Sequence, residues 1–113
     1  GGLIAAVKGA PEVVLARCGL DPAAHAEWLA RIEEFAGSGH KVIACAWRPL
    51  EGESWPGGEP DRDFRVAGLL CFEDPVRPGV GEALRACHAA RIRVIMVTGD
   101  HPATARAVAR ELG

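Results

Sequence analysis

Two short turns in this 113-residue chain each combine a glycine with a side chain able to contact phosphate. Lys8-Gly9 runs into Ala10-Pro11-Glu12, and Thr98-Gly99-Asp100 comes shortly before Pro102. Lysine supplies a point charge, a threonine hydroxyl can hydrogen-bond a phosphoryl oxygen, and glycine lets the backbone approach a ligand closely. Taken alone, each turn is more simply interpreted as a strand-to-helix connection without a ligand.

A third cation, Lys41, follows Gly39-His40 at the start of an apolar stretch. It could reach a phosphate or lie in water, and its surroundings in the sequence leave both interpretations open. Asp61-Arg62-Asp63 has the spacing of an acidic nucleophile element, but it follows a Gly- and Pro-rich stretch, so we interpret it as loop charge. The histidines and cysteines lack the spacing of metal ligands, and we expect no metal site.

Composition indicates a globular domain, with 49% hydrophobic and 25% charged residues. The length corresponds to less than one domain of roughly 150 residues. A net charge of -2 gives no general attraction to nucleic acid or anionic lipid, and no apolar run approaches the ~20 residues of a membrane span. We therefore expect neither a nucleic-acid partner nor direct membrane contact. Four scattered cysteines (18, 45, 71 and 87) predict buried, reduced thiols and a cytosolic environment.

The first part of the chain predicts helices that cover a mainly antiparallel sheet. Strands are expected over 3–7, 41–47 and 64–72, and a polar loop over 49–63. Pro11 starts a short helix, and Asp21-Pro22 caps a longer one that ends at Gly37-Ser38-Gly39. Trp28 and Trp47 are expected in the core.

After Glu73 the pattern changes to helix, strand and helix, which is typical of a parallel α/β sheet. The two prolines of 74–78 hold the chain extended and mark a domain boundary. A helix over 80–90, a strand over 93–98 and a helix from Pro102 follow, with Asp100 as a candidate cap. The fold class is therefore α/β, and both ends look cut from a larger protein.

The order of these motifs resembles the cytoplasmic part of P-type cation-transporting ATPases. Lys8-Gly9-Ala10-Pro11-Glu12, Gly39-His40-Lys41-Val42, Asp74-Pro75-Val76-Arg77-Pro78 and Thr98-Gly99-Asp100 occur in the family's succession from end to end. The resemblance implies that 1–74 is the C-terminal half of the nucleotide-binding domain. Residues 75–113 would be part of the phosphorylation domain, which has the haloacid-dehalogenase-like fold.

The resemblance also implies roles for individual residues. Lys8 and Gly9 would line the ATP pocket, and Lys41, where arginine is frequent, would keep a charge for the nucleotide without the bidentate fork. The interdomain hinge would be Asp74, Pro75 and Arg77, with Val76 in place of the commoner second proline. The phosphoryl group would be contacted by Thr98, Gly99 and Asp100; His101 replaces a frequent asparagine and receives no role.

Two motifs that the family needs for ATP hydrolysis are missing from this sequence. The family's D-K-T-G-T phosphorylation motif and its later magnesium-holding aspartates do not occur. We expect ATP and Mg²⁺ to serve the parent pump at the cytoplasmic face of a membrane, and this soluble segment alone to be inactive. Its partners would be ATP and the rest of the ATPase chain, and it should self-associate, for example by exchange of the segment after Pro78. A soluble dehalogenase-like phosphatase and a non-enzymatic nucleotide-binding module are the alternatives.

Overall fold

A computed structural model describes residues 2–52, 55 and 57–113. The chain separates into two compact units, which do not follow the linear order of the sequence. The first unit contains residues up to Ile32 together with Val42–Cys71, and the second contains Glu33–Lys41 together with Phe72–Gly113. The end of the long central helix and the turn after it therefore belong with the C-terminal helices.

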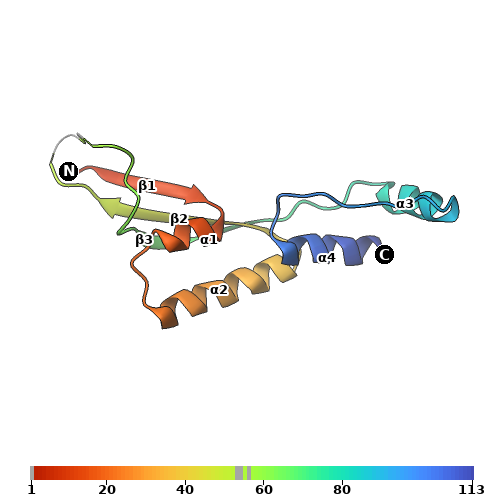
Figure 1. Cartoon of the computed structure of the whole chain (residues 1–113), viewed down its shortest axis with the longest axis horizontal. Coiled ribbons are helices and arrows are strands. Elements are labelled where there is room, and N and C mark those ends of the chain that lie inside the picture. The colour runs from red at the N-terminus through yellow and green to blue at the C-terminus, as the bar shows by residue number, and fades with distance from the viewer. Residues whose placement is uncertain (1, 53–54, 56) are drawn as a thin grey trace. The chain divides into compact units, whose positions relative to one another are not determined.

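The first unit is built on an antiparallel sheet with strands in the order β1-β2-β3. The strands are β1 (Ile4–Gly9), β2 (Lys41–Pro49) and β3 (Arg65–Phe72). Figure 1 shows β1 and β2 running in opposite directions. Their register places Ile4 opposite Pro49 and Gly9 opposite Ala44. Burial alternates along both strands, as expected for a sheet with one covered face. The predicted α/β class, with helices and an antiparallel sheet, is confirmed.

The core of the first unit lies where α1 (Pro11–Ala16) packs against the sheet. Its buried members are Val14, Ala44, Ala46 and Phe64. Small residues at two adjacent inward positions of β2 leave room for the phenyl ring and the valine, because close packing needs large side chains opposite small ones.

The long helix α2 (Pro22–Gly37) begins and ends as its sequence predicts. The backbone N–H of Ala24 donates to Asp21 Oδ1 at 2.7 Å, so Asp21 caps the helix. At the other end, Gly39 N–H donates to the Ala36 carbonyl and His40 N–H to the Phe35 carbonyl. This is a Schellman motif, and Gly39 has the left-handed φ of 89° that the motif requires.

Two expectations about burial are wrong. Cys71 is exposed and the other three free thiols are only half-buried, although burial still raises the pKa of Cys18. Trp47 is 36% exposed and Trp28 is half-buried, and both lie under an arginine guanidinium. An arginine stacked on an indole covers part of the apolar ring while the tryptophan stays at the surface. The apolar character of these tryptophans alone therefore did not determine their burial.

The second unit contains α3 (Val80–Ala89) and α4 (Pro102–Leu112), both close to their predicted positions. The strand predicted over 93–98 is not formed, because in the described part of the chain no strand lies beside it to supply hydrogen bonds. The segment is extended and exposed instead: Ile95 is 69% and Val97 92% accessible. A β-strand needs backbone hydrogen bonds to an adjacent strand. Residues with high β-propensity that lack such a neighbour form only an extended chain.

The predicted loop 49–63 connects β2 and β3; its residues 53, 54 and 56 lie outside the described residues. Asp61 lies in this loop beside Arg62, which hydrogen-bonds its carboxylate and lowers the pKa of Asp61. The structure thus confirms the interpretation of Asp61-Arg62-Asp63 as exposed loop charge. Over the described ranges, no helix combines the length and apolarity needed to cross a bilayer.

Candidate functional site

The second unit brings the turn after α2 against the first two turns of α4. Gly39, in its left-handed conformation, ends α2 and directs the chain toward Lys41. A Cβ added at Gly39 would lie 3.8 Å from Ala107 Cβ, so this turn lies close to α4. The geometry places a lysine from the middle of the sequence beside a helix near its end.

The start of α4 is organised by three polar residues, Thr98, Asp100 and His101. The Asp100 N–H donates to Thr98 Oγ1 at 3.1 Å, which folds Thr98-Gly99-Asp100 into a tight turn. The helix cap is His101, whose Nδ1 accepts from the Ala103 N–H at 3.1 Å. The expectation that Asp100 caps this helix is therefore wrong, because Pro102 occupies the first helical position and makes its predecessor the cap.

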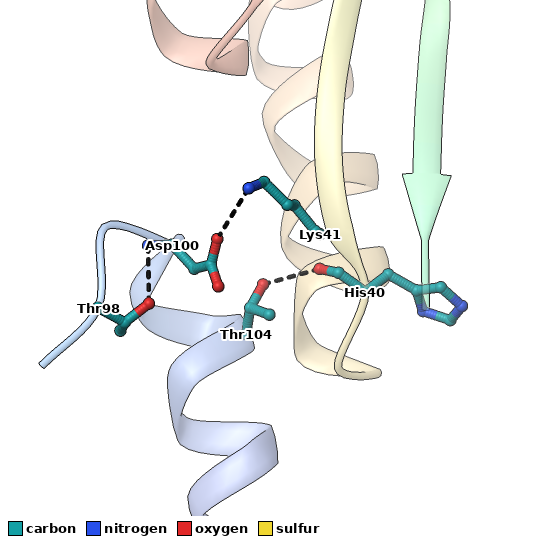
Figure 2. A network of polar contacts seen from close by, with 5 residues as sticks. All are labelled: His40, Lys41, Thr98, Asp100 and Thr104. Carbon is teal, nitrogen blue, oxygen red and sulfur yellow. Dashed lines mark hydrogen bonds and ion pairs between the residues drawn. The ribbon is translucent and has the colours of Figure 1, made fainter. Parts of the chain in front are cut away.

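Figure 2 shows the polar contacts that join the two segments. Lys41 Nζ lies 3.5 Å from Asp100 Oδ1, and the Thr104 hydroxyl donates to the His40 carbonyl at 2.8 Å. The His40 imidazole points away from this cluster (Figure 2). On the other side of the helix start, His101 Nε2 lies 3.5 Å from Glu33 Oε1 of α2.

These contacts differ in what they contribute to stability. The Lys41 and Asp100 side chains are 62% and 39% exposed, and an exposed ion pair contributes at most about 1 kcal/mol. Thr104 is 5% exposed, and leaving a buried hydrogen-bonding group without its partner costs about 1–3 kcal/mol. The buried hydroxyl is therefore the stronger of the two connections between the turn and α4.

A hollow of about 360 Å³ opens next to this cluster in the second unit. Its lining combines an amine, two carboxylates and a hydroxyl with apolar side chains of 72–80 and of α4. The polar lining residues are Lys41, Asp74, Asp100 and Thr104. Such a lining can contact both charged and apolar groups of a ligand.

The structure thus assembles several of the residues singled out from the sequence. Lys41, Asp74 and Asp100 line one hollow, and Thr98 is bonded to Asp100. Thr98 is exposed, and a Cβ added at Gly99 would meet open space. Neither packing nor a positive φ therefore demands glycine at position 99.

The remaining predicted residues lie elsewhere. Lys8 is exposed at the end of β1, opposite Cys45, and Gly9 follows it in the first unit. Pro75 and Arg77 are exposed in a segment without regular structure. Across residues 2–52, 55 and 57–113, no three His, Cys, Asp or Glu side chains gather into a group able to hold a metal ion.

Sequence reasoning missed Thr104, His101 and Glu33. The signal for His101 was present, since the residue before a helix-starting proline is the cap. Thr104 could have been noticed as a polar residue on the face that also carries Val108 and Leu112. Its acceptor, however, lies 64 positions away, and no local pattern indicates that pairing.

Comparison with known proteins gives the family. The haloacid dehalogenase-like hydrolase family matches residues 22–113. Calcium-transporting ATPase 1, plasma membrane-type, of Oryza sativa subsp. japonica is 39% identical over 118 residues, which cover 95% of this chain and 11% of that protein. Calcium-transporting ATPase 2, plasma membrane-type, of Arabidopsis thaliana is 38% identical over 125 residues, 100% of this chain and 12% of its own length.

The similarity extends to pumps for other ions. Sodium/potassium-transporting ATPase subunit alpha-A of Artemia franciscana is 35% identical over 131 residues, covering 99% of this chain and 13% of its own. The chain thus spans between about a tenth and an eighth of the length of these relatives. The resemblance to cation-transporting P-type ATPases is confirmed along the whole chain, and the chain belongs to the haloacid dehalogenase-like hydrolases.

Proposed function

We propose that this chain is the part of a P-type cation pump that binds ATP and contacts the phosphoryl group, on the cytoplasmic face of the membrane. The observation that carries the proposal is the approach of Lys41 to the Thr98-Gly99-Asp100 turn, 3.5 Å from Asp100, beside an open hollow. The relatives named above are ion-transporting ATPases, which supports ATP as the ligand. The rest of such an ATPase chain is the proposed partner.

Each residue has a distinct part in this proposal. The Thr98 hydroxyl accepts from the Asp100 N–H and keeps its own proton to donate to a phosphoryl oxygen. Gly99 keeps open the space through which the phosphate approaches. Lys41 adds positive charge, which Asp100 balances when no nucleotide is present. Lys8 and Gly9, in the first unit, serve as further nucleotide contacts.

The domain assignment belongs to the same proposal. Residues 1–74 form half of the nucleotide-binding domain and 75–113 part of the phosphorylation domain. Asp74, Pro75 and Arg77 form the hinge that transmits nucleotide occupancy from one to the other. The prolines support this role, since they keep the connecting segment stiff. In the complete enzyme Mg²⁺ would neutralise phosphate charge, and most of its ligands would come from outside this sequence.

Titration of the chain with fluorescently labelled ATP tests the proposal. Lys8→Ala should weaken binding about tenfold, the loss expected for one charge-assisted hydrogen bond. Gly99→Ala should weaken it by a similar factor without lowering the melting temperature, because the added methyl meets open space in the protein. Arg31→Ala removes an equal charge away from the predicted contacts and should bind as the wild type does. Equal affinities for all four chains would refute the assignment.

Hydrolysis is a separate question. We expect no steady-state phosphate release from this chain with ATP and Mg²⁺, because no D-K-T-G-T aspartate is present to accept the phosphoryl group. Addition of the missing part of the phosphorylation domain, supplied in the same polypeptide, should restore phosphorylation. Turnover by the 113-residue chain itself would contradict the expectation and would favour a soluble phosphatase.

A further inference from the structure

Thr104 makes a buried contact that the proposed nucleotide site does not explain. Thr104 is the third residue of α4, so no preceding turn of its own helix offers a carbonyl to its hydroxyl. It donates to the carbonyl of His40, at 2.8 Å and 64 positions away in the sequence. Thr104 is 5% exposed, so bulk water has little access to its hydroxyl. The bond therefore anchors the backbone of the turn that precedes Lys41.

The turn lies close to α4 at two successive levels. Thr104 binds His40, and Ala107, three residues further along the same helix face, lies 3.8 Å from where a Cβ at position 39 would be. Gly39 fixes the direction of the chain through its left-handed φ of 89°. The next residue after this anchored segment is Lys41, so the origin of its side chain is set by contacts that involve no charge.

The ion pair cannot set that position by itself. The Lys41 and Asp100 side chains are both substantially exposed, so solvent weakens their attraction and salt screens it. A long lysine side chain on a free turn would sample many positions. The proximity of Lys41 to Asp100 thus depends on where the backbone of residues 39–41 is held (Figure 2).

We propose that Thr104 is a positioning residue: through its hydroxyl it holds the Gly39-His40-Lys41 turn so that the Lys41 amine reaches the phosphate-contacting turn at Thr98-Gly99-Asp100. Thr104 itself does not touch the nucleotide. Its role rests on the proposed function, since the amine it places is the one assigned to the phosphates of ATP.

A ligand-free experiment tests the positioning. Carbodiimide links an amine to a carboxylate only when the two touch, so the yield of the Lys41–Asp100 cross-link, read by mass spectrometry of peptides, reports their proximity. Thr104→Val keeps the shape and removes the hydroxyl, and should lower the yield about fivefold, the factor for one hydrogen bond. Thr104→Ser keeps the hydroxyl and should restore the yield to near the wild-type value. An unchanged yield in Thr104→Val would overturn the proposal.

A second variant covers the case in which Thr104→Val does not fold. Asp100→Asn removes the ion pair and leaves the hydroxyl bond intact. The nuclear Overhauser contact between the Gly39 α-protons and the Ala107 methyl should persist in Asp100→Asn at wild-type intensity. Its disappearance would show that the ion pair holds the turn and would overturn the role of Thr104.

ATP titration separates this inference from the proposed function. Thr104→Val should weaken ATP binding about fivefold in the wild-type background and by less than about twofold in Lys41→Met. Equal weakening in both backgrounds would show that Thr104 contributes only to the overall stability of the fold, and it would overturn the inference. If the wild-type chain bound no ATP while the cross-link still required the hydroxyl, the proposed function would fail and the positioning of Lys41 would stand.

Discussion

We expect the chain to self-associate, and we expect Ile95→Lys to make it a monomer. The extended segment 92–97 exposes most of its apolar side chains, with Ile95 at 69% and Val97 at 92%, and pairs with no strand in the described part of the chain. Such an edge seeks a partner strand, and a second copy can supply one. In the intact pump proposed above, the rest of the chain would cover the segment.

The loss of association should be large, because a two-fold symmetric dimer contains the substitution twice. In a two-fold dimer each substitution occurs twice, and burying an isoleucine side chain contributes about 1.5–3 kcal/mol. Two lysines in place of two isoleucines should therefore weaken association by about 100-fold or more. Sedimentation velocity over a range of chain concentrations measures the change.

Val13→Lys is the matched control for this experiment. Val13 is also exposed, at 51%, but it lies on helix α1 of the first unit and offers no strand edge. We expect Val13→Lys to associate as the wild type does. A wild-type chain that sediments as a monomer, or dissociation caused by Val13→Lys alone, would contradict the expectation.

Phe64→Ala should have the largest effect on folding. The ring is 3% exposed and packs with Val14, Ala44 and Ala46, which are themselves almost fully buried. Removing a core phenylalanine costs about 3–5 kcal/mol, against a total stability of about 5–15 kcal/mol for a small protein. The first unit should therefore lose most of its stability, measured by urea unfolding followed through tryptophan fluorescence.

The position of Phe64 makes this cavity difficult to close. Its backbone N–H donates to the Arg17 carbonyl and its own carbonyl accepts from Gly19, which ties the residue to the chain that follows α1. Those bonds restrict collapse of the backbone into the space left by the ring. Leu70→Ala, in β3 and 47% exposed, is the control and should cost less than about half as much. Similar losses for both variants would show that the core lies elsewhere.

Local elements were predictable because each is specified by residues close together in sequence. Asp21 caps α2, Gly39 ends it, and the proline at position 102 starts α4, as the types and spacing of these residues indicate. The three strands of the first unit were also predicted to within a few residues. Caps, turns and alternating burial all arise from contacts within a few positions, so one sequence is sufficient to identify them.

Burial and pairing were less predictable, because they depend on distant parts of the chain. The run Arg93–Thr98 has the composition of a buried strand, but it forms none without neighbours. The cysteines and Trp47 are apolar enough for a core, yet the packing leaves them partly exposed. The polarity of a side chain shows whether it can be buried, whereas the helices and strands packed around it determine whether it is buried.

The candidate site divides in the same way. The residue types alone indicate that Lys41 and the Thr98-Gly99-Asp100 turn carry groups suited to phosphate, because this chemistry belongs to the side chains. The approach of Lys41 to Asp100, and the bond from the Thr104 hydroxyl to the carbonyl of His40, are seen only in the folded chain. A contact between residues 64 positions apart depends on how the intervening chain folds, because this folding brings the two residues together. The local conformational preferences of either residue do not specify it.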